Sequence, residues 1–192
     1  TEEIRQLAIF LASNVGKRFS YRTLQTVSGL KSTHSVKDYL DYFRQSYLFY
    51  TVKKFDYSIK KQNANPQKVY AVDSAFANKL GFRFTEDRGR LLENVIYIEL
   101  LRRKKEVFYH SDAATECDFI IREGIKVTAA LQVCWTLHHE NLNREVGGLQ
   151  AAMSTYDLNR GLLIVWEAPN QQLAALPEGI DFILAWDWLV QR

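Results

Sequence analysis

The strongest constraint on the fold comes from the second half of the chain, where a long helical pattern is followed by strand-like runs. Apolar residues recur at helical spacing from Arg88 to about Lys104, and Asp87 can cap this helix. A second helix is expected from about Asn141 to Tyr156. Strands are expected at Glu106–His110, Cys117–Arg122, Ile125–Trp135, Gly161–Trp166 and Ile180–Trp186. The order α-β-β-β-α-β-β predicts an α+β or α/β fold with a mixed sheet flanked by helices.

The first half has a different pattern, in which three short helices precede two strands. Apolar residues at helical spacing predict a first helix over residues 2–15. Ser20 can cap a second helix, Gly29 supplies the turn after it, and Ser32 opens a third helix. Two strand-like runs and the polar loop between them then follow: Phe49–Ile59, Lys68–Asp73 and residues 60–67. Three helices followed by a hairpin predict a winged helix-turn-helix.

The aromatic side chains around the third helix are expected mainly in the core, rather than as platforms on which bases stack. The inward face of that helix is predicted to carry Val36, Tyr39, Leu40, Phe43 and Tyr47. Three more aromatic residues are assigned to the same core: Tyr42, Phe49 and Tyr50.

The net charge of +3 hides two halves of opposite sign. Residues 1–85 contain 14 Lys and Arg against 6 Asp and Glu, a net charge of +8, and the rest of the chain carries −5. Such asymmetry marks a domain boundary, so we predict a winged-helix domain at residues 1–85 and a second domain at residues 86–192. The excess of cations predicts an anionic partner for the first domain, which for a winged helix is duplex DNA.

Side chains that contact DNA are expected at two places in the first domain. The start of the third helix would meet base edges and phosphates through Ser32, Thr33, His34, Ser35 and Lys37. The wing would contribute Lys53, Lys54, Lys60, Lys61 and Lys68. The alternative interpretation is that these lysines form a solvated surface and that the motif joins proteins.

Other properties limit the class of protein. No apolar run approaches the roughly 20 residues of a membrane span, so no membrane partner is expected. Cys117 and Cys134 lie in apolar strand-like runs, which favours free buried thiols in a reducing cytoplasm. The chain starts without Met and without a secretion signal, which indicates a fragment of a longer protein.

The second domain contains a group of residues typical of a metal-dependent nuclease. Side chains alternate along a strand, so Asp118 on one strand and Gln132 on the next can meet. Glu93, on the preceding helix, would be the third corner of this group. A nuclease needs two or three oxygen ligands on a divalent cation and a lysine to orient water. Here Gln132 and Cys134 stand where a carboxylate and a lysine are expected.

At this point the chain resembles a known family, the domain of unknown function that follows prokaryotic AAA-type ATPases and has a PD-(D/E)XK nuclease-like core. The segments that carry the resemblance are Asp87–Asn94, Glu116–Ile121, Leu131–Trp135 and Trp186–Leu189. Upstream, Tyr39-Leu40, Tyr47–Tyr50 and Val69–Asp73 are similar to the winged-helix section of that family. The resemblance covers nearly the whole chain.

The resemblance implies a degenerate nuclease site. Glu93 and Asp118 correspond to the acidic residues of the nuclease pattern, and Gln132 and Cys134 occupy its Glu-x-Lys positions. A magnesium ion could be held by the two carboxylates, but the favoured interpretation is a hydrogen-bonded structural pair that needs no cofactor. Lys126 or Arg144 could replace the missing lysine, although no sequence pattern supports either residue.

The resemblance also implies an ATPase domain ahead of Thr1, which would be a partner of this region and would bind the ATP. Three hypotheses follow for the chain itself: a module that binds duplex DNA without cutting it, an active metal-dependent endonuclease, or a protein-interaction or homo-oligomerisation module that regulates the ATPase. Asp118→Ala would abolish cleavage under the second hypothesis. The third is suggested by Trp135, Trp186 and Trp188, which are otherwise expected in the core.

Overall fold

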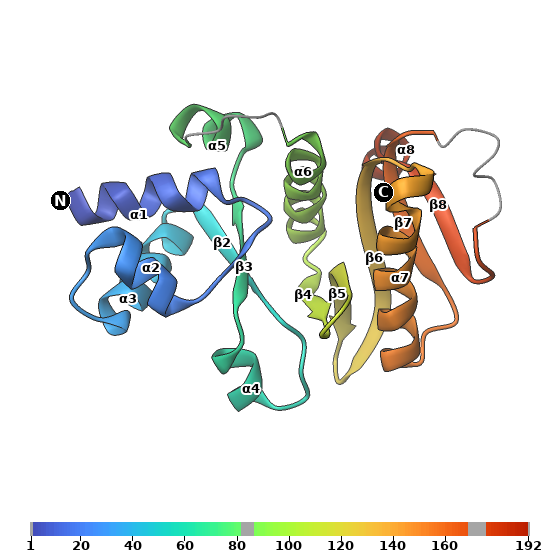
Figure 1. The fold of residues 1–192 in the computed structure, drawn as a ribbon, viewed down its shortest axis with the longest axis horizontal. Helices are drawn as coiled ribbons and strands as arrows, with labels where there is room; N and C mark the ends of the chain where they lie inside the picture. The colour runs from blue at the N-terminus through green and yellow to red at the C-terminus, as the bar shows by residue number, and fades with distance from the viewer. Residues whose placement is uncertain (1, 82–86, 169–175, 192) are drawn as a thin grey trace. The chain divides into compact units, whose positions relative to one another are not determined.

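A computed structural model describes residues 2–81, 87–168 and 176–191 of the chain. Within these residues the fold is mixed α+β, with eight helices, a three-stranded antiparallel sheet and a five-stranded mixed sheet (Figure 1). The chain divides into two compact units, residues 1–98 and 99–192. The boundary predicted between residues 85 and 86 lies in segment 82–86, outside the described residues.

The first unit follows the predicted order of three helices and a hairpin. Its elements are α1 (Glu2–Ser13), β1 (Arg18–Phe19), α2 (Tyr21–Ser28), α3 (Thr33–Gln45), β2 (Phe49–Lys53), α4 (Ile59–Ala64), β3 (Gln67–Ala71), α5 (Ser74–Leu80) and the start of α6 (Arg88–Arg102). The sheet order is β1-β3-β2, so β3 is the central strand and is hydrogen-bonded on both sides. α1, α2 and α3 pack on one another next to this sheet (Figure 1).

The local signals for the helix ends are confirmed. The Ser20 side chain accepts a hydrogen bond from the Thr23 amide at 3.0 Å and so caps α2. Gly29 ends this helix in the left-handed region at φ 73°, which a residue without a Cβ adopts without strain. The Ser32 side chain caps α3 through the Ser35 amide at 3.1 Å. These caps depend only on neighbouring residues, which is why the sequence predicts them.

The hairpin and the end of α3 differ from the prediction. The loop predicted as polar and irregular contains the short helix α4, and β2 ends at Lys53 rather than at Ile59. Tyr47 was predicted to face inward, and this is wrong: it lies past the end of α3 with φ 60° and is 69 % exposed. The core prediction also fails for Tyr42, which is 60 % exposed, whereas Phe43 and Phe49 are buried as expected.

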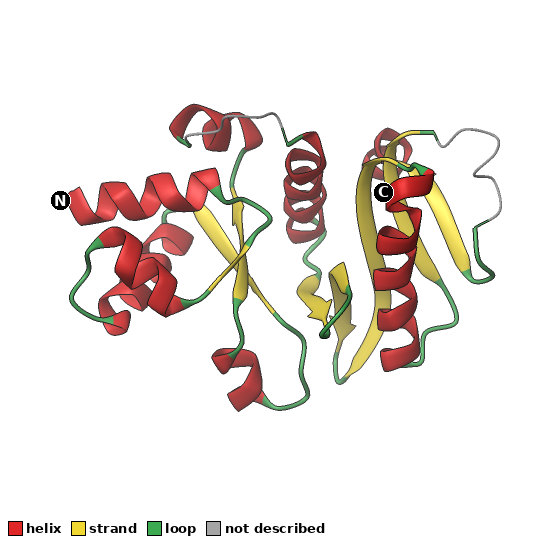
Figure 2. Cartoon of the chain, viewed as in Figure 1, coloured by secondary structure: helices red, strands yellow, loops and turns green. Residues whose placement is uncertain are grey.

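The second unit contains the predicted mixed sheet. Its elements are the end of α6, β4 (Glu106–Ser111), β5 (Glu116–Glu123), β6 (Lys126–Thr136), α7 (His139–Tyr156), β7 (Gly161–Glu167), β8 (Ile180–Leu184) and α8 (Ala185–Val190). The order is β4-β5-β6-β7-β8, antiparallel from β4 to β6 and parallel from β6 to β8. Helix α7 packs along β5, β6 and β7 (Figure 2). The last predicted strand is two residues shorter, because the chain turns into α8 at Ala185.

The C-terminal helix of this unit is held by Arg103, which directly follows α6. The Arg103 guanidinium donates to the carbonyl oxygens of Trp188 and Gln191, both at 2.8 Å, and lies 4.2 Å from the centre of the Trp188 ring. Arg103 also pairs with Glu99 at 2.6 Å. Carbonyl groups at a helix C-terminus have no partner within the helix, so a guanidinium that satisfies two of them anchors α8.

Candidate functional site

The group of polar residues predicted in the second unit forms where β5 and β6 separate. The two strands are paired from Glu123 and Lys126 up to Phe119 and Leu131. Beyond that point, side chains replace the backbone ladder. The Asp118 amide donates to Gln132 Oε1 at 3.1 Å, and the Val133 amide donates to Asp118 Oδ2 at 3.1 Å. The expected meeting of Asp118 and Gln132 is therefore confirmed.

A third residue, the acidic Glu145, completes this group and was missed by the sequence analysis. Gln132 Nε2 donates to Glu145 Oε2 on α7 at 2.7 Å, so the amide of Gln132 is used at both ends. Glu145 is 5 % exposed and also accepts from its neighbour Arg144 at 3.1 Å. The signal was present in the sequence, because Glu145 lies four residues before the buried Leu149 and therefore on the apolar stripe of α7.

A glycine on α7 brings Glu145 to the sheet. A Cβ atom built on Gly148 would lie 1.9 Å from the carbonyl oxygen of Glu116 on β5, far inside van der Waals contact. The absence of a side chain at this position therefore permits the close approach of the helix to the strand. Glu145 lies about one turn earlier on the same helix, which places its carboxylate beside Gln132.

Cys134 is close to this group, but its thiol is not activated. Burial and, to a lesser extent, the negative charge of Glu145 raise the pKa of Cys134 to about 12. The Sγ atom donates to the Thr136 carbonyl oxygen at 3.0 Å. A nucleophilic cysteine needs a lowered pKa, because the thiolate is the reactive form. The geometry gives no support to Cys134 as a nucleophile.

Glu93, the third residue predicted for the nuclease-like group, instead forms hydrogen bonds within the first unit. Its Oε1 atom accepts from Lys68 Nζ at 2.9 Å and from the Tyr70 hydroxyl at 2.6 Å. Lys68 is 1 % exposed, Tyr70 is fully buried and Glu93 is 7 % exposed. The prediction that Lys68 is a surface lysine of the wing is therefore wrong. Lys68 lies in the central strand β3, where its ammonium group is enclosed and paired with a carboxylate.

The next residue of α6 fastens the helix to the same strand. The Asn94 side chain accepts from the Ala71 amide at 2.8 Å and donates to the Ala71 carbonyl oxygen at 3.0 Å. Tyr97, one turn later, stacks on Tyr70 with ring centres 4.3 Å apart. Burial raises the pKa of the Tyr97 hydroxyl, which therefore stays protonated. Glu93, Asn94 and Tyr97 thus form one helix face that packs on β3.

The donor atoms in the second unit do not fit a magnesium site. In the part of the chain that the structure describes, no three His, Cys, Asp or Glu residues lie together as potential metal ligands. Asp118 Oδ2, Gln132 Oε1 and Glu145 Oε2 each accept a hydrogen bond from the protein. A magnesium site needs carboxylate oxygens that are open to the ion, whereas the oxygens of this group are engaged with donors of the protein.

The two residues considered as substitutes for the missing lysine lie in different places. Lys126 is at the first position of β6, six residues before Gln132, which corresponds to about 20 Å along a strand. Arg144 is on α7 beside Glu145, and the negative charges of Glu145 and Asp118 act on it. Arg144 is therefore the cation nearer to the Asp118–Gln132 pair.

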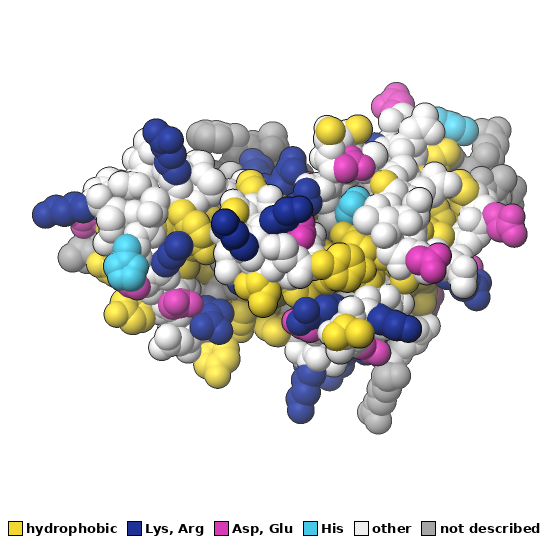
Figure 3. Space-filling model, turned by 90° about the horizontal axis from the view of Figure 1, so that it is seen from below, with side chains coloured by type: hydrophobic (Ala, Val, Ile, Leu, Met, Phe, Trp, Pro, Cys, Tyr) yellow, Lys and Arg dark blue, Asp and Glu magenta, His cyan; other side chains and the backbone are white. Residues whose placement is uncertain are grey.

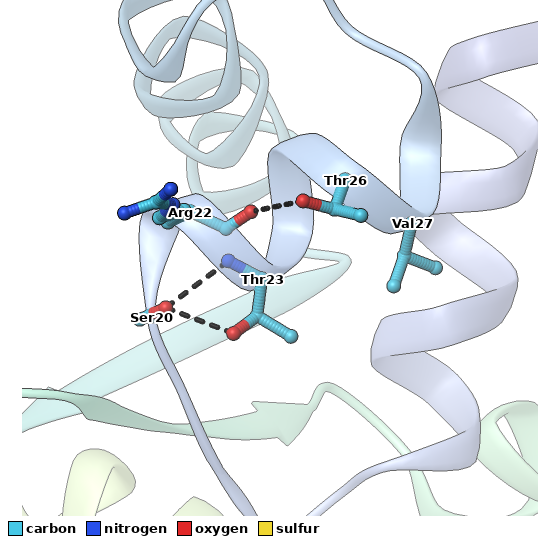
Figure 4. A pocket seen from close by; sticks show the side chains of 5 residues that line it. All are labelled: Ser20, Arg22, Thr23, Thr26 and Val27. Atoms are coloured by element: carbon cyan, nitrogen blue, oxygen red, sulfur yellow. Dashed lines mark hydrogen bonds between the residues drawn. The ribbon is translucent and has the colours of Figure 1, made fainter.

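The exposed side of α2 carries polar side chains that are hydrogen-bonded within the helix and at its start. Figure 4 shows the shallow hollow along α2, lined by Ser20, Arg22, Thr23, Thr26 and Val27. The Ser20 and Thr23 hydroxyl oxygens are 2.8 Å apart, and the Thr26 hydroxyl donates to the Arg22 carbonyl oxygen at 3.0 Å. These bonds fix the polar side chains against the helix backbone.

The residues expected to contact DNA at the start of α3 are mostly exposed. Thr33, His34 and Lys37 are exposed, whereas Ser32 and Ser35 are half-buried and bonded to each other at 3.1 Å. Lys37 Nζ lies 5.0 Å from the centre of the Tyr21 ring. Asp38 lies 3.9 Å from His34, so the exposed side of α3 carries a negative charge beside its cations.

Four of the five predicted wing lysines reach the surface. Lys60 and Lys61 on α4 are exposed, and Lys53 and Lys54 at the end of β2 are half-buried. Lys53 Nζ donates to Asn63 Oδ1 at 2.8 Å. Figure 3 looks at the first unit from the side on which α4 lies in Figure 1, and Lys and Arg side chains are visible there. Lys68 is excluded because it is buried.

Three of the four tryptophans of the second unit cluster where β6, β7 and β8 end. Trp135 and Trp166 are stacked with ring centres 5.0 Å apart, and Trp166 is perpendicular to Trp186 at 6.0 Å. Trp186 is 46 % exposed and Trp166 is 36 % exposed. Trp188 is buried against Arg103 and belongs to the core.

Comparisons with known proteins reveal relatives without a known activity. Residues 1–87 match a domain family described as Domain of unknown function (DUF8612). The chain is 30% identical over 132 residues to the Uncharacterized protein MJ1544 of Methanocaldococcus jannaschii, an alignment of 67% of this chain and 29% of that protein. It is 28% identical over 195 residues to an uncharacterized protein of Haemophilus influenzae, which covers the whole chain and 46% of that protein. The chain therefore spans less than half the length of each of these relatives. No solved structure matches.

In the described residues, no helix is long and apolar enough to cross a membrane.

Proposed function

We propose that this chain is a duplex-DNA-binding module, in which the first unit is a winged helix and the second is a PD-(D/E)XK nuclease-like domain that does not cut. The order of elements in the first unit and the sheet order β1-β3-β2 support a winged helix, with α3 as the recognition helix. The observation that carries the proposal is the position of its exposed cations. Lys37 projects from α3, and Lys60 and Lys61 project from the hairpin helix α4.

The charge of the first unit supports nucleic acid as the partner. Residues 1–85 carry a net charge of +8, which exceeds what solubility requires of a domain of this size. Lysines that neutralise phosphates release counterions, and this release supplies most of the affinity of non-specific DNA binding. Asp38 and Asp41 on α3 weaken the field locally, so the hairpin lysines are expected to contribute the larger share.

The second unit is proposed to add contacts to DNA without hydrolysing it. Gln132 and Cys134 occupy the positions of the carboxylate and the lysine, and the Cys134 thiol is protonated and buried. Glu93 is already the counter-charge of Lys68. Because the Cys134 thiol is protonated, Glu93 is paired with Lys68, and the described residues contain no cluster of three potential metal ligands, we expect the module to leave its DNA intact and to need no cofactor.

The parent protein is proposed to be a cytoplasmic AAA-type ATPase, with this region as its C-terminal part. The aligned relatives are more than twice as long as this chain, which leaves room for an ATPase domain. ATP would then bind in that domain, and this region would hold the DNA on which the ATPase acts.

The experiment that tests the proposal is fluorescence anisotropy of labelled duplex and single-stranded DNA over a salt series, with magnesium present and the DNA recovered on a gel. Contact with about 4–6 phosphates gives a slope of about −4 to −5 in log K against log salt. Lys60→Glu with Lys61→Glu should flatten this slope. Lys104→Glu with Lys126→Glu is the matched control, because it makes the same charge change at two exposed lysines of the second unit.

Each result separates the hypotheses. Intact DNA with the expected slope supports the binding module. If the native chain shortens the DNA and the Asp118→Ala variant leaves it intact, the chain is an endonuclease instead. Absence of binding to any DNA at low salt would refute the proposal.

A second function, protein interaction or self-association, is favoured by one observation. The exposed rings of Trp166 and Trp186 form an apolar surface at the edge of the sheet. Sedimentation velocity of the native chain and of Trp186→Ser would test it. A self-associating native chain whose variant sediments as a monomer would support this function, and a monomeric native chain would exclude homo-oligomerisation.

A further inference from the structure

The tip of the hairpin in the first unit exposes two large apolar side chains where the end of a strand was predicted. Tyr57 is 76 % exposed and Ile59 is 72 % exposed. They lie on either side of Ser58, in the turn that leads from β2 into α4. Exposed apolar side chains are common singly, but a neighbouring aromatic and branched aliphatic pair at the end of a hairpin is a candidate contact surface.

This tip is rigid, so its apolar side chains are held in place. The buried Phe55 packs edge-on against Tyr57 with ring centres 5.2 Å apart. Asp56 Oδ1 accepts from the Ser58 amide at 2.8 Å, and the Asp56 carbonyl oxygen accepts from Gln62 Nε2 at 2.6 Å. The bond from Lys53 Nζ to Asn63 Oδ1 at 2.8 Å ties α4 back to β2. A preorganised tip loses little conformational entropy when it binds.

The charges around the tip favour a polyanion. Residues 53–67 contain Lys53, Lys54, Lys60 and Lys61, and Asp56 is the single acidic residue among them. One Asp56 oxygen already accepts a hydrogen bond from the turn. Lys60 and Lys61 directly follow Ile59, so two exposed ammonium groups flank the apolar pair on the same short helix.

We propose that Tyr57 and Ile59 form an apolar wedge that enters the minor groove of duplex DNA and partly unstacks one base step, while Lys60 and Lys61 neutralise the flanking phosphates. This inference rests on the proposed function, because it names how the same module grips DNA. Apolar side chains inserted from the minor groove unstack a base step, and the additional contacts that the bent duplex makes with the protein offset this cost. The lysines hold the duplex against the wedge through the phosphates that border the groove.

The chemistry of the tip favours DNA over a lipid surface. A segment that inserts into a membrane interface needs a broad apolar face along a helix, whereas α4 has six residues and exposes one large apolar side chain. The tip therefore offers two apolar side chains and neighbouring lysines, which suit a base step and its phosphates better than a lipid surface.

The test uses the whole chain and short duplexes that each carry 2-aminopurine at a different position, because the fluorescence of this base rises when it is unstacked. We expect the native chain to raise the fluorescence several-fold at one or a few positions. Tyr57→Ser with Ile59→Ser should remove this rise and weaken binding by about 10-fold, while the salt slope stays unchanged because the lysines remain. Both side chains are more than 70 % exposed, so the variant is expected to fold, and its thermal transition checks that the lost contact of Tyr57 with Phe55 does not unfold the first unit. Ile125→Ser, which removes an 85 % exposed apolar side chain from the second unit, is the matched control.

The outcomes separate this inference from the proposed function. Duplex binding with a normal salt slope, but with no fluorescence change at any 2-aminopurine position, would overturn the wedge and leave the DNA-binding module standing. No duplex binding at low salt would overturn both. Binding to vesicles of phosphatidylserine and phosphatidylcholine that requires Tyr57 and Ile59, in the absence of DNA binding, would assign the tip to a membrane surface and would also overturn the wedge.

Discussion

The buried ion pair of the first unit gives the sharpest prediction about stability. Glu93→Ala removes the carboxylate that accepts from Lys68 at 2.9 Å and from Tyr70 at 2.6 Å. Lys68 is 1 % exposed, so its ammonium group would remain in the protein interior without this counter-charge. If Glu93 were instead a catalytic residue, its removal would affect activity and leave the fold of the first unit almost unchanged.

The magnitude follows from the geometry. At an effective dielectric constant of about 20, two unit charges separated by this distance attract by about 6 kcal/mol, and desolvation of both groups opposes this attraction. Removal of one partner from a buried pair typically destabilises a protein by about 3–5 kcal/mol. Replacement of both partners, as in Lys68→Met with Glu93→Leu, should cost much less, because no charge is left in the interior.

The assay must report on the first unit separately. All four tryptophans lie between residues 135 and 188, so tryptophan fluorescence reports only on the second unit. Hydrogen exchange of the β3 amides reports on the first unit. In Glu93→Ala these amides should exchange about 10²–10⁴ times faster, as a loss of 3–5 kcal/mol requires. A change of less than about 1 kcal/mol, with normal exchange in β3, would refute the assignment of Glu93 as the counter-charge of Lys68.

Three further predictions concern the second unit. Gly148→Ala places a Cβ atom 1.9 Å from the Glu116 carbonyl oxygen and should destabilise this unit by about 1–3 kcal/mol or more, measured by the thermal transition of tryptophan fluorescence. Cys134, with its pKa raised to about 12, should not react with iodoacetamide at pH 8 in the native protein but should react in urea; rapid native labelling would contradict its burial. Glu99, whose pKa its hydrogen bonds to Arg102 and Arg103 lower from 4.5 to about 2, stabilises the fold fully above pH 4.5 and loses this effect as the pH falls toward 2. Glu99→Gln should therefore be less stable than the native chain at pH 7, and urea titrations should show the difference vanish near pH 2.

Local chemistry explains which features were predictable. The caps at Ser20 and Ser32 and the turn at Gly29 involve residues at most three or four positions apart, so the same short segment contains both the signal and its partner. The contact of Asp118 with Gln132 follows from strand alternation and a tight hairpin, in which Gly124 takes φ 62°. Such features depend only on residues that are close in the sequence, and the sequence alone therefore predicts them.

The failures come from contacts that join distant segments. Lys68 was predicted on the surface because a lysine in a hairpin is normally solvated, and nothing near it in the sequence reveals that Glu93, 25 residues later, lies beside it. The predicted site lacked Glu145 for the same reason, because its hydrogen-bond partner Gln132 lies on another element. Tyr47 was misplaced because α3 ends at Gln45 and Tyr47 itself takes a left-handed φ of 60°, so helical spacing no longer sets the direction of its ring.

The sequence by itself determined the order of the elements, the helix caps, the opposite charges of the two halves and the pairing of Asp118 with Gln132. Only the tertiary structure decided the roles of the charged residues. Glu93 became the partner of a buried lysine, Glu145 joined the polar group of the second unit, and Tyr57 and Ile59 were left exposed at the tip of a rigid hairpin. The physical reason is that periodicity and capping act over one or two helical turns, whereas the burial and pairing of a charge depend on which surfaces meet when the chain folds.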